Sequence, residues 1–168
     1  ITQIIGNLPD YDKIGNIKLL NEDPFKDDLM KAQIPVDDKL IAYLTYPAAR
    51  KEKVPVVIYL HAYLNATGHR WGYYGYKTRV GEGIARHGFL AVEYDQFGYG
   101  QRNDASGMEF YDKHPELSAL GVMIRDVSKV IDAVSQLEWV DKDNIMVAGY
   151  SLGGMVGLYS AVFDKRIQ

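Results

Sequence analysis

The stretch that decides the fold is NIMVAGYSLGGMVGLYS, residues 144–160. Its first six residues are mostly apolar and predict a buried strand, and residues 152–162 predict a helix. Ser151 stands at the corner between the two, inside a Gly-x-Ser-x-Gly pattern. A serine at a tight turn from strand to helix is held in a strained backbone conformation with its hydroxyl exposed. We therefore expect Ser151 to be a nucleophile.

The residues around Ser151 fit this interpretation. Strand and helix come so close at such a turn that the positions two before and two after the serine must be small, as Gly149 and Gly153 are. The positive end of the helix points at the serine, which favours an oxyanion there. The backbone N–H of Leu152 is the first expected donor to that oxyanion. A chance match to so short a motif is the alternative, and the apolar strand and helix around it argue against chance.

Upstream of this turn, strand patterns alternate with helix patterns. Residues 39–47 and 89–95 are rich in β-favouring side chains, and residues 54–60 form an apolar run typical of a strand buried on both faces. A helix is predicted over residues 76–88, and a longer one over residues 117–138, where apolar residues recur at three- and four-residue spacing. The alternation predicts an α/β fold, a mostly parallel sheet flanked by helices. Functional groups of such sheets gather at the carboxyl ends of the strands.

The chain is expected to have two unequal parts. Residues 1–37 are polar and rich in turn-forming residues, so we interpret them as an irregular N-terminal extension laid across the core. Residues 38–168 carry all the predicted strands and helices, and they form the second part.

Composition excludes several classes of protein. The 168 residues carry a formal net charge of −3, which argues against nucleic acid as a partner. No apolar run reaches the ~20 residues that span a bilayer, so no membrane partner is expected. Without cysteine there is no disulfide and no thiolate chemistry, and the four histidines lack the spacing of a helical zinc site. We expect no metal and no other cofactor, and a soluble protein that is either cytoplasmic or secreted.

The loop HAYLNATGHRW, residues 61–71, follows the predicted strand at residues 54–60. An acyl-transfer site needs a second backbone donor to its oxyanion, and the N–H of Tyr63 is the best placed. His61 is interpreted as a structural residue of this loop. A group of aromatic residues close by is expected either to line a substrate pocket or to pack in the ordinary way: Trp71, Tyr73, Tyr74 and Tyr76.

A second loop, DQFGYGQR, covers residues 95–102. Its glycines do not have the spacing of nucleotide-binding motifs, so nucleotide binding is not expected. Asp95 is interpreted as an acceptor for loop N–H groups rather than as a catalytic acid. Arg102 is expected either to pair with a carboxylate or to lie on the surface. Glu93, inside the preceding strand, would need a partner if it were buried.

Three segments in one order, VVIYLHAY, VEYDQFGYGQR and VAGYSLGG, resemble the α/β-hydrolase superfamily. Within it, residues 39–168 are most similar to acetyl xylan esterases and dienelactone hydrolase-like esterases. The resemblance implies a serine nucleophile, an Asp or Glu, and a His, in that chain order. Ser151 matches the nucleophile, and Tyr63 and Leu152 match the oxyanion-hole donors. Ala62 departs from the pattern, because these enzymes usually have glycine there.

The acid and the histidine that the resemblance implies have no match in the chain. Asp164 follows Ser151 but lies near the end of the predicted helix, away from the strand ends, and no histidine follows Ser151. We therefore expect both groups beyond Gln168. The hydrolase domain is then truncated after the nucleophile helix, and its C-terminal half is a continuation of the chain or a separate chain.

The resemblance implies a serine hydrolase that cleaves a small-molecule ester, such as an acetyl or carbohydrate ester, through an acyl-enzyme. The alternative is a non-catalytic fragment or binding module, because a serine without its base is a poor nucleophile. A prolyl-oligopeptidase-like peptidase or a thioesterase stays open as well, since nothing in the sequence separates these leaving groups.

Overall fold

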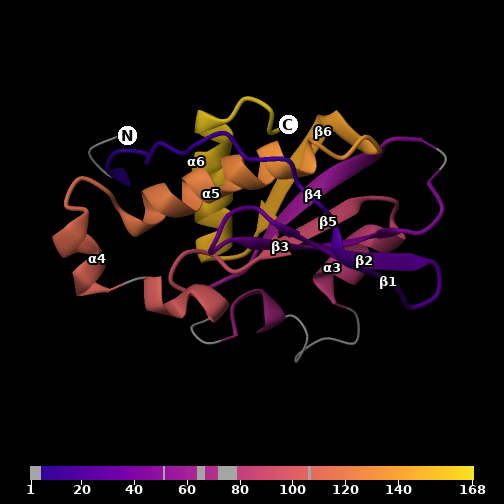
Figure 1. Cartoon of the computed structure of the whole chain (residues 1–168), viewed down its shortest axis with the longest axis horizontal. Coiled ribbons are helices and arrows are strands. Elements are labelled where there is room, and N and C mark those ends of the chain that lie inside the picture. Colours follow the sequence, from indigo (N-terminus) through magenta and orange to yellow (C-terminus); the bar gives the residue numbers. More distant parts are fainter. Residues whose placement is uncertain (1–4, 51, 64–66, 72–78, 106) are drawn as a thin grey trace.

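The structure is a computed structural model that describes residues 5–50, 52–63, 67–71, 79–105 and 107–168. Its strands form one six-stranded sheet, with helices on both faces (Figure 1). The strands are β1 (Leu20–Phe25), β2 (Leu29–Pro35), β3 (Ile41–Pro47), β4 (Val54–Leu60), β5 (Leu90–Tyr94) and β6 (Val140–Gly149). The helices are η1 (Gly68–Trp71), α3 (Val80–Arg86), η2 (Gly100–Ala105), α4 (Met108–Lys113), α5 (Ala119–Val134) and α6 (Leu152–Phe163).

The sheet has the order β1-β2-β3-β5-β4-β6. The pairs β1–β2, β2–β3 and β3–β5 are antiparallel, whereas β5–β4 and β4–β6 are parallel. The α/β class predicted from the sequence is confirmed, but in the described part the sheet is mixed rather than mostly parallel. The parallel strands are those joined by helices, because a parallel pair needs a long crossover.

The antiparallel strands β1 and β2 correct the interpretation of residues 1–37 as irregular. These strands form a hairpin that pairs with β3 in continuous register from Leu29 opposite Pro47 to Pro35 opposite Ile41. The sequence of β1 contains Pro24 and lacks the alternating apolar pattern of a half-buried strand, and the strand is almost wholly exposed. Pairing with a neighbouring strand, which a single-sequence pattern cannot reveal, decides the structure here.

The other predicted elements match the structure closely. The apolar run at residues 54–60 is β4, and the strands predicted at residues 39–47 and 89–95 are β3 and β5. The long predicted helix is α5, which begins after Ser118, whose Oγ accepts a hydrogen bond from the N–H of Gly121. The helix predicted over residues 76–88 appears as α3, and residues 76–78 lie outside the described residues.

Helices α3 and α5 lie on opposite faces of the sheet. Gly81 of α3 lies against Glu93 and Ala91 of β5. The next residue of β5, Tyr94, faces α5, because the charge of Asp126 on α5 acts on its hydroxyl. Successive side chains of a strand point to opposite faces, so the two helices cover different sides. Helix α6 packs against α5 and β6 on the α5 side (Figure 1). No helix in the described ranges is both long and apolar enough to cross a membrane.

Described segments near both ends of the chain contact the rest of the domain. The N-terminal segment runs alongside α5 (Figure 1), where the hydroxyl of Tyr11 donates to Asp132 at 2.7 Å. At the other end, Ile167 forms a parallel bridge with Ile145 of β6, and the N–H of Gln168 donates to the carbonyl of Ile145 at 2.9 Å. The last residues therefore pair with the outer edge of β6.

Candidate active site

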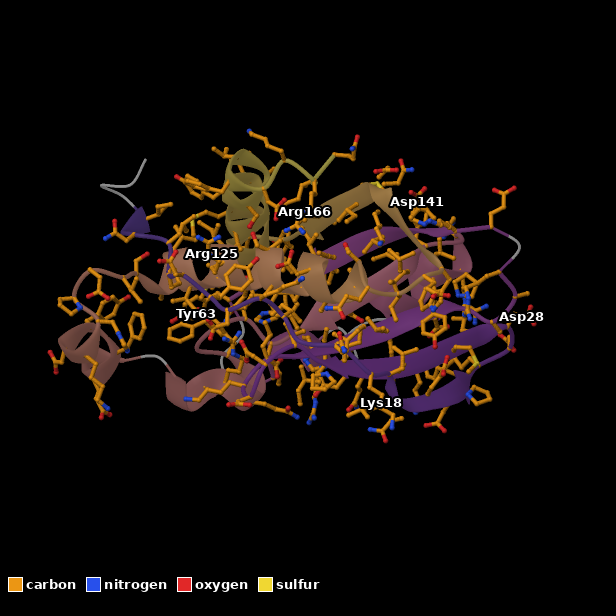
Figure 2. The ribbon with its side chains drawn as sticks, turned by 45° about the horizontal axis from the view of Figure 1, so that its top comes forward. Lys18, Asp28, Tyr63, Arg125, Asp141 and Arg166 are labelled. Atoms are coloured by element: carbon orange, nitrogen blue, oxygen red, sulfur yellow. The ribbon has the colours of Figure 1, made fainter. Side chains whose placement is uncertain are left out.

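The parallel strands β4, β5 and β6 end at the same edge of the sheet. His61, Asp95 and Ser151 follow these strand ends, so the loops that carry them meet at this edge. Tyr63 lies at this end of the sheet in Figure 2, whereas Asp28 and Asp141 lie at the opposite end. The topology thus brings the loops that carry these three residues to one edge of the sheet.

Ser151 has an unusual backbone conformation at the start of α6. Its φ of 52° and ψ of −114° lie in a region that residues other than glycine rarely occupy. The residue is exposed, and its side chain makes no capping hydrogen bond to α6. The hydroxyl is therefore left available at the positive end of a 12-residue helix.

The glycines next to Ser151 allow close backbone contact within the turn. A Cβ added to Gly149 would come within 2.4 Å of the carbonyl carbon of Gly153. A Cβ added to Gly153 would come within 2.1 Å of the carbonyl oxygen of Leu60, at the end of β4. The turn after β6 and the loop after β4 therefore touch through their backbones, with no side chain between them.

The predicted oxyanion donors belong to these two touching segments. Leu152 is the first residue of α6, and Tyr63 comes three residues after the end of β4. The N–H of Tyr150 also points to the end of β4, with 3.4 Å between its nitrogen and the carbonyl oxygen of Leu60. The predicted donors thus belong to two segments, the start of α6 and the loop after β4, whose backbones are in direct contact.

His61 is buried and uses both ring nitrogens within this edge of the sheet. Its Nδ1 donates to the carbonyl of Ala62 at 2.7 Å, so that nitrogen carries the proton. Its Nε2 accepts the backbone N–H of Gln96 at 3.1 Å, so that nitrogen is unprotonated. Burial lowers the pKa of His61, in agreement with the neutral ring that these two bonds require. His61 is therefore a structural residue of the loop, and its lone pair is not available to act as a base.

Aromatic rings surround the loop after β4. The Tyr63 ring is 68% exposed and meets the buried Tyr99 ring edge to face, with 5.3 Å between centroids. Tyr99 also lies edge-on to the His61 ring at 5.5 Å. The predicted aromatic group at Tyr73, Tyr74 and Tyr76, with the Trp71 side chain, lies outside the described residues.

Asp95 accepts hydrogen bonds from the surrounding loops, as predicted. Its carboxylate accepts the backbone N–H of His69 at 2.9 Å, His69 Nδ1 at 2.6 Å and the N–H of Gln101 at 2.9 Å. Burial would raise the pKa of Asp95, but these hydrogen bonds lower it overall. Gly68 and Gly100 leave room for the carboxylate, since a Cβ on either would come within 2.3 Å of it. Asp95 thus joins two loops at the site edge.

Arg102 is buried and pairs with a carboxylate, so the surface alternative is wrong. Its Nη1 lies 2.6 Å from Oδ2 of Asp126 on α5 and also donates to the carbonyl of Asp95 at 3.2 Å. Burial raises the pKa of Asp126, and the charge of Arg102 acts in the opposite direction. This ion pair fixes the glycine-rich loop on α5.

Asp164 lies at the opposite end of α6 from Ser151. The helix has 12 residues, so about 18 Å separate its ends. The Asp164 carboxylate is paired with Arg166 at 2.6 Å.

No three His, Asp or Glu side chains among the described residues could hold a metal ion. The contacts of Gln96 and Tyr99 were not predicted from the sequence, although the position of Gln96, directly after Asp95 at a strand end, was a signal.

Comparisons with known proteins agree with this architecture. No curated protein sequence matches the chain significantly. Similar solved structures include a provisionally assigned acetyl xylan esterase from Bacteroides fragilis NCTC 9343, with 18% identity, a TM-score of 0.73, and coverage of 99% of this chain and 49% of the other. A glucuronoyl esterase from Solibacter usitatus has 16% identity, a TM-score of 0.68 and coverage of 97% and 52%. Acetyl xylan esterase 1 from Thermoanaerobacterium sp. JW/SL YS485 has 21% identity, a TM-score of 0.65 and coverage of 90% and 50%.

The chain therefore spans about half the length of each of these proteins. At these identities the likeness shows a shared α/β-hydrolase fold. The family itself rests on the sequence, because residues 34–168 match the model of acetyl xylan esterase (AXE1). The chain belongs to the acetyl xylan esterase (AXE1) family of the α/β-hydrolase superfamily.

Proposed function

We propose that this chain is the N-terminal part of a serine hydrolase that cleaves a carboxylic ester through an acyl-enzyme. The observation that carries the proposal is the strained backbone of Ser151 at the start of α6, packed directly against the loop after β4. That geometry supports the proposal that the Ser151 hydroxyl and the N–H groups of Leu152 and Tyr63 face the same space. Family membership favours an acetyl ester on a carbohydrate as the substrate.

In the proposed mechanism, Ser151 Oγ attacks the ester carbonyl carbon, and its proton passes to a histidine supplied by the rest of the domain. The N–H groups of Tyr63 and Leu152 donate to the oxygen that becomes negative. The same histidine returns the proton to the leaving alcohol, which leaves the acyl group on Ser151. Water then attacks the acyl-enzyme and releases the acid and the free serine.

Exposed apolar side chains on α6 support the proposal that a further part of the hydrolase domain packs against this helix. Tyr150 is 71% exposed and Leu158 70% exposed, and Met155, Val162 and Phe163 add further exposed apolar surface on or beside the same helix. Single exposed apolar residues are ordinary, but a contiguous group of large ones marks an interface. Ile167 already forms a parallel bridge with Ile145 of β6. We therefore propose that the domain formed by residues 38–168 continues with further parallel strands beside β6, and that this additional part packs on the exposed face of α6.

The test is turnover of a chromogenic acetyl ester by the complete protein. The proposal expects a burst of released alcohol equal to the enzyme concentration wherever deacylation is slow, and its loss in Ser151→Ala. Ser135→Ala, at the other end of the sheet after α5, is the matched control and should keep full activity. Unchanged turnover in Ser151→Ala would refute the proposal.

One observation favours the non-catalytic alternative for this chain alone: no histidine follows Ser151. A serine-directed fluorophosphonate probe separates the two functions. Rapid stoichiometric labelling of the 168-residue chain that is lost in Ser151→Ala would exclude an inert module. Comparing acetyl esters, thioesters and prolyl peptides as substrates of the complete protein then decides among the esterase, thioesterase and peptidase functions.

A further inference from the structure

Gln96 holds the loop after β4 by two hydrogen bonds to one residue. Its backbone N–H donates to His61 Nε2 at 3.1 Å, and its side-chain Nε2 donates to the His61 carbonyl oxygen at 2.7 Å. Gln96 is fully buried and follows β5, the neighbour of β4 in the sheet. The two bonds therefore fix both the ring and the backbone of His61 to the adjacent strand end.

The position of His61 in turn sets the position of the next two residues. The His61 ring donates to the carbonyl of Ala62 at 2.7 Å, which orients the peptide that joins Ala62 to Tyr63. The N–H of that peptide is the Tyr63 donor of the proposed oxyanion hole. A continuous series of hydrogen bonds thus runs from the Gln96 amide through His61 to the peptide that carries this donor.

Packing alone does not explain why a polar amide side chain occupies this buried position. The amide atom that faces the His61 carbonyl oxygen must be the donor Nε2, because two oxygens cannot form a hydrogen bond there. The amide oxygen Oε1 therefore points the other way. Oε1 is buried and accepts no hydrogen bond from the residues that the structure describes. A buried acceptor without a partner is unfavourable, so an apolar side chain of similar size would suit the core better. The gain that offsets this cost is the bond to His61.

We propose that Gln96 is a positioning residue, which aims the Tyr63 N–H at the oxyanion by holding the His61 carbonyl and ring. This inference rests on the proposed function, since it concerns the oxyanion hole of that site. Gln96 touches neither Ser151 nor the substrate in this role. Its effect is on the stabilisation of the transition state rather than on the affinity for the ester.

Two substitutions test the role in the complete protein. Gln96→Met keeps the volume and the backbone N–H but removes the side-chain donor. We expect kcat to fall about 100-fold, the usual cost of a displaced oxyanion donor, with KM within a factor of about 3. Affinity for a trifluoromethyl ketone, which forms an oxyanion on the serine, should fall by the same factor as kcat. Gln101→Met is the matched control, since this glutamine is exposed in the same loop and should leave all three values unchanged.

Gln96→Glu gives a readout that a packing role would not produce. A protonated carboxyl can donate to the His61 carbonyl as the amide does, whereas an ionised carboxylate faces that oxygen with a like charge. The ratio of kcat in Gln96→Glu to kcat in the unmodified protein should therefore rise as the pH falls. The same ratio for Gln96→Met should stay flat, which separates this effect from titration of the catalytic histidine.

The outcomes distinguish this inference from the proposed function. If Ser151→Ala abolishes turnover but Gln96→Met keeps kcat and inhibitor affinity, the positioning role is wrong and the function stands. If both Gln96 variants lose activity without recovery of Gln96→Glu at low pH, the role is packing, and the inference is overturned. If Gln96→Met does not fold, the pH ratio of Gln96→Glu decides alone. If Ser151→Ala keeps full turnover, the proposed function itself fails.

Discussion

Gly153 lies directly against the carbonyl oxygen of Leu60, with room for a hydrogen and no more. A Cβ on Gly153 would come within 2.1 Å of that oxygen and within 2.8 Å of the His61 carbonyl oxygen. Both atoms are backbone at the end of β4, which is held between β5 and β6 in the sheet. Neither can move away without disturbing the pairing of β4 with β5 and β6. The turn that carries Ser151 is thus fixed to the loop that carries the second proposed oxyanion donor.

Gly153→Ala should therefore abolish esterase activity and destabilise the fold by about 1–3 kcal/mol, the usual cost of overpacking. The matched control is the next residue, because a Cβ on Gly154 would meet Gly149 O at 3.4 Å and Gly149 C at 3.8 Å, both ordinary contact distances. Gly154→Ala should be tolerated in activity and stability. Urea denaturation and ester turnover measure the two effects. Equal behaviour of the two variants would contradict the close contact.

The buried ion pair between Arg102 and Asp126 should behave differently when one or both partners are removed. Arg102→Met leaves the Asp126 carboxylate buried without its partner, and we expect a loss of about 3–5 kcal/mol in the free energy of unfolding. Asp126→Leu should cost a similar amount for the same reason. The double variant should lose less than the sum of the two, because no unpaired charge is left. Additive losses in a double-mutant cycle would show that the pair is not coupled.

The sequence predicted the half of the fold that surrounds the site better than the other half. Strand β4 and the turn at Ser151 have strong local signals: an apolar run bounded by turns, and small residues at fixed distances from a serine. Strand β1 has none, because it is exposed and its structure comes from pairing with β2, the next strand of the hairpin. Local patterns predict buried elements well, whereas edge strands depend on contacts that a single sequence does not show.

The same limit applied to the interior of the site. Asp95 was identified as an acceptor because a carboxylate after a strand, followed by glycines, has a local meaning. The bonds from Gln96 to His61 join residues 35 positions apart, and those between Arg102 and Asp126 join residues 24 apart. Which side chains meet across such distances is set by strand order. That order, with β4 beside β5, was not predicted from the sequence.

Glu93 should make stability depend on pH between about 4.5 and 7. Burial raises the pKa of this carboxyl to about 7 from an ordinary value of 4.5, while the charges of His69 and Arg79 act in the opposite direction. Between these values the unfolded chain is ionised and the folded chain still binds the proton. Stability from this group is therefore fully present below pH 4.5 and is lost as the pH rises to 7, by about 3 kcal/mol.

Glu93→Gln removes this titration with almost no change of shape. The variant should be more stable than the unmodified protein at pH 8, and the difference should shrink towards pH 4.5. His61 has the opposite sign, because its lowered pKa favours the folded state at higher pH. The quantity to follow is thus the difference between the two proteins in urea denaturation at each pH. A difference that does not vary with pH would rule out a raised pKa for Glu93.

The exposed apolar surface of α6 leads to a prediction that compares the chain alone with the complete protein. Leu158 is 70% exposed in this structure, so Leu158→Lys should change the unfolding free energy of the 168-residue chain by no more than about 0.5 kcal/mol. It should also reduce self-association of that chain in sedimentation velocity, because it interrupts the apolar surface. In the complete protein the same lysine would be buried without a partner, and we expect a loss of about 3 kcal/mol or more. Lys165→Ala, an exposed change just beyond α6, is the control and should have little effect in either protein. An equally small effect of Leu158→Lys in both proteins would mean that nothing covers this face of α6, and the proposal of a completing half would fail.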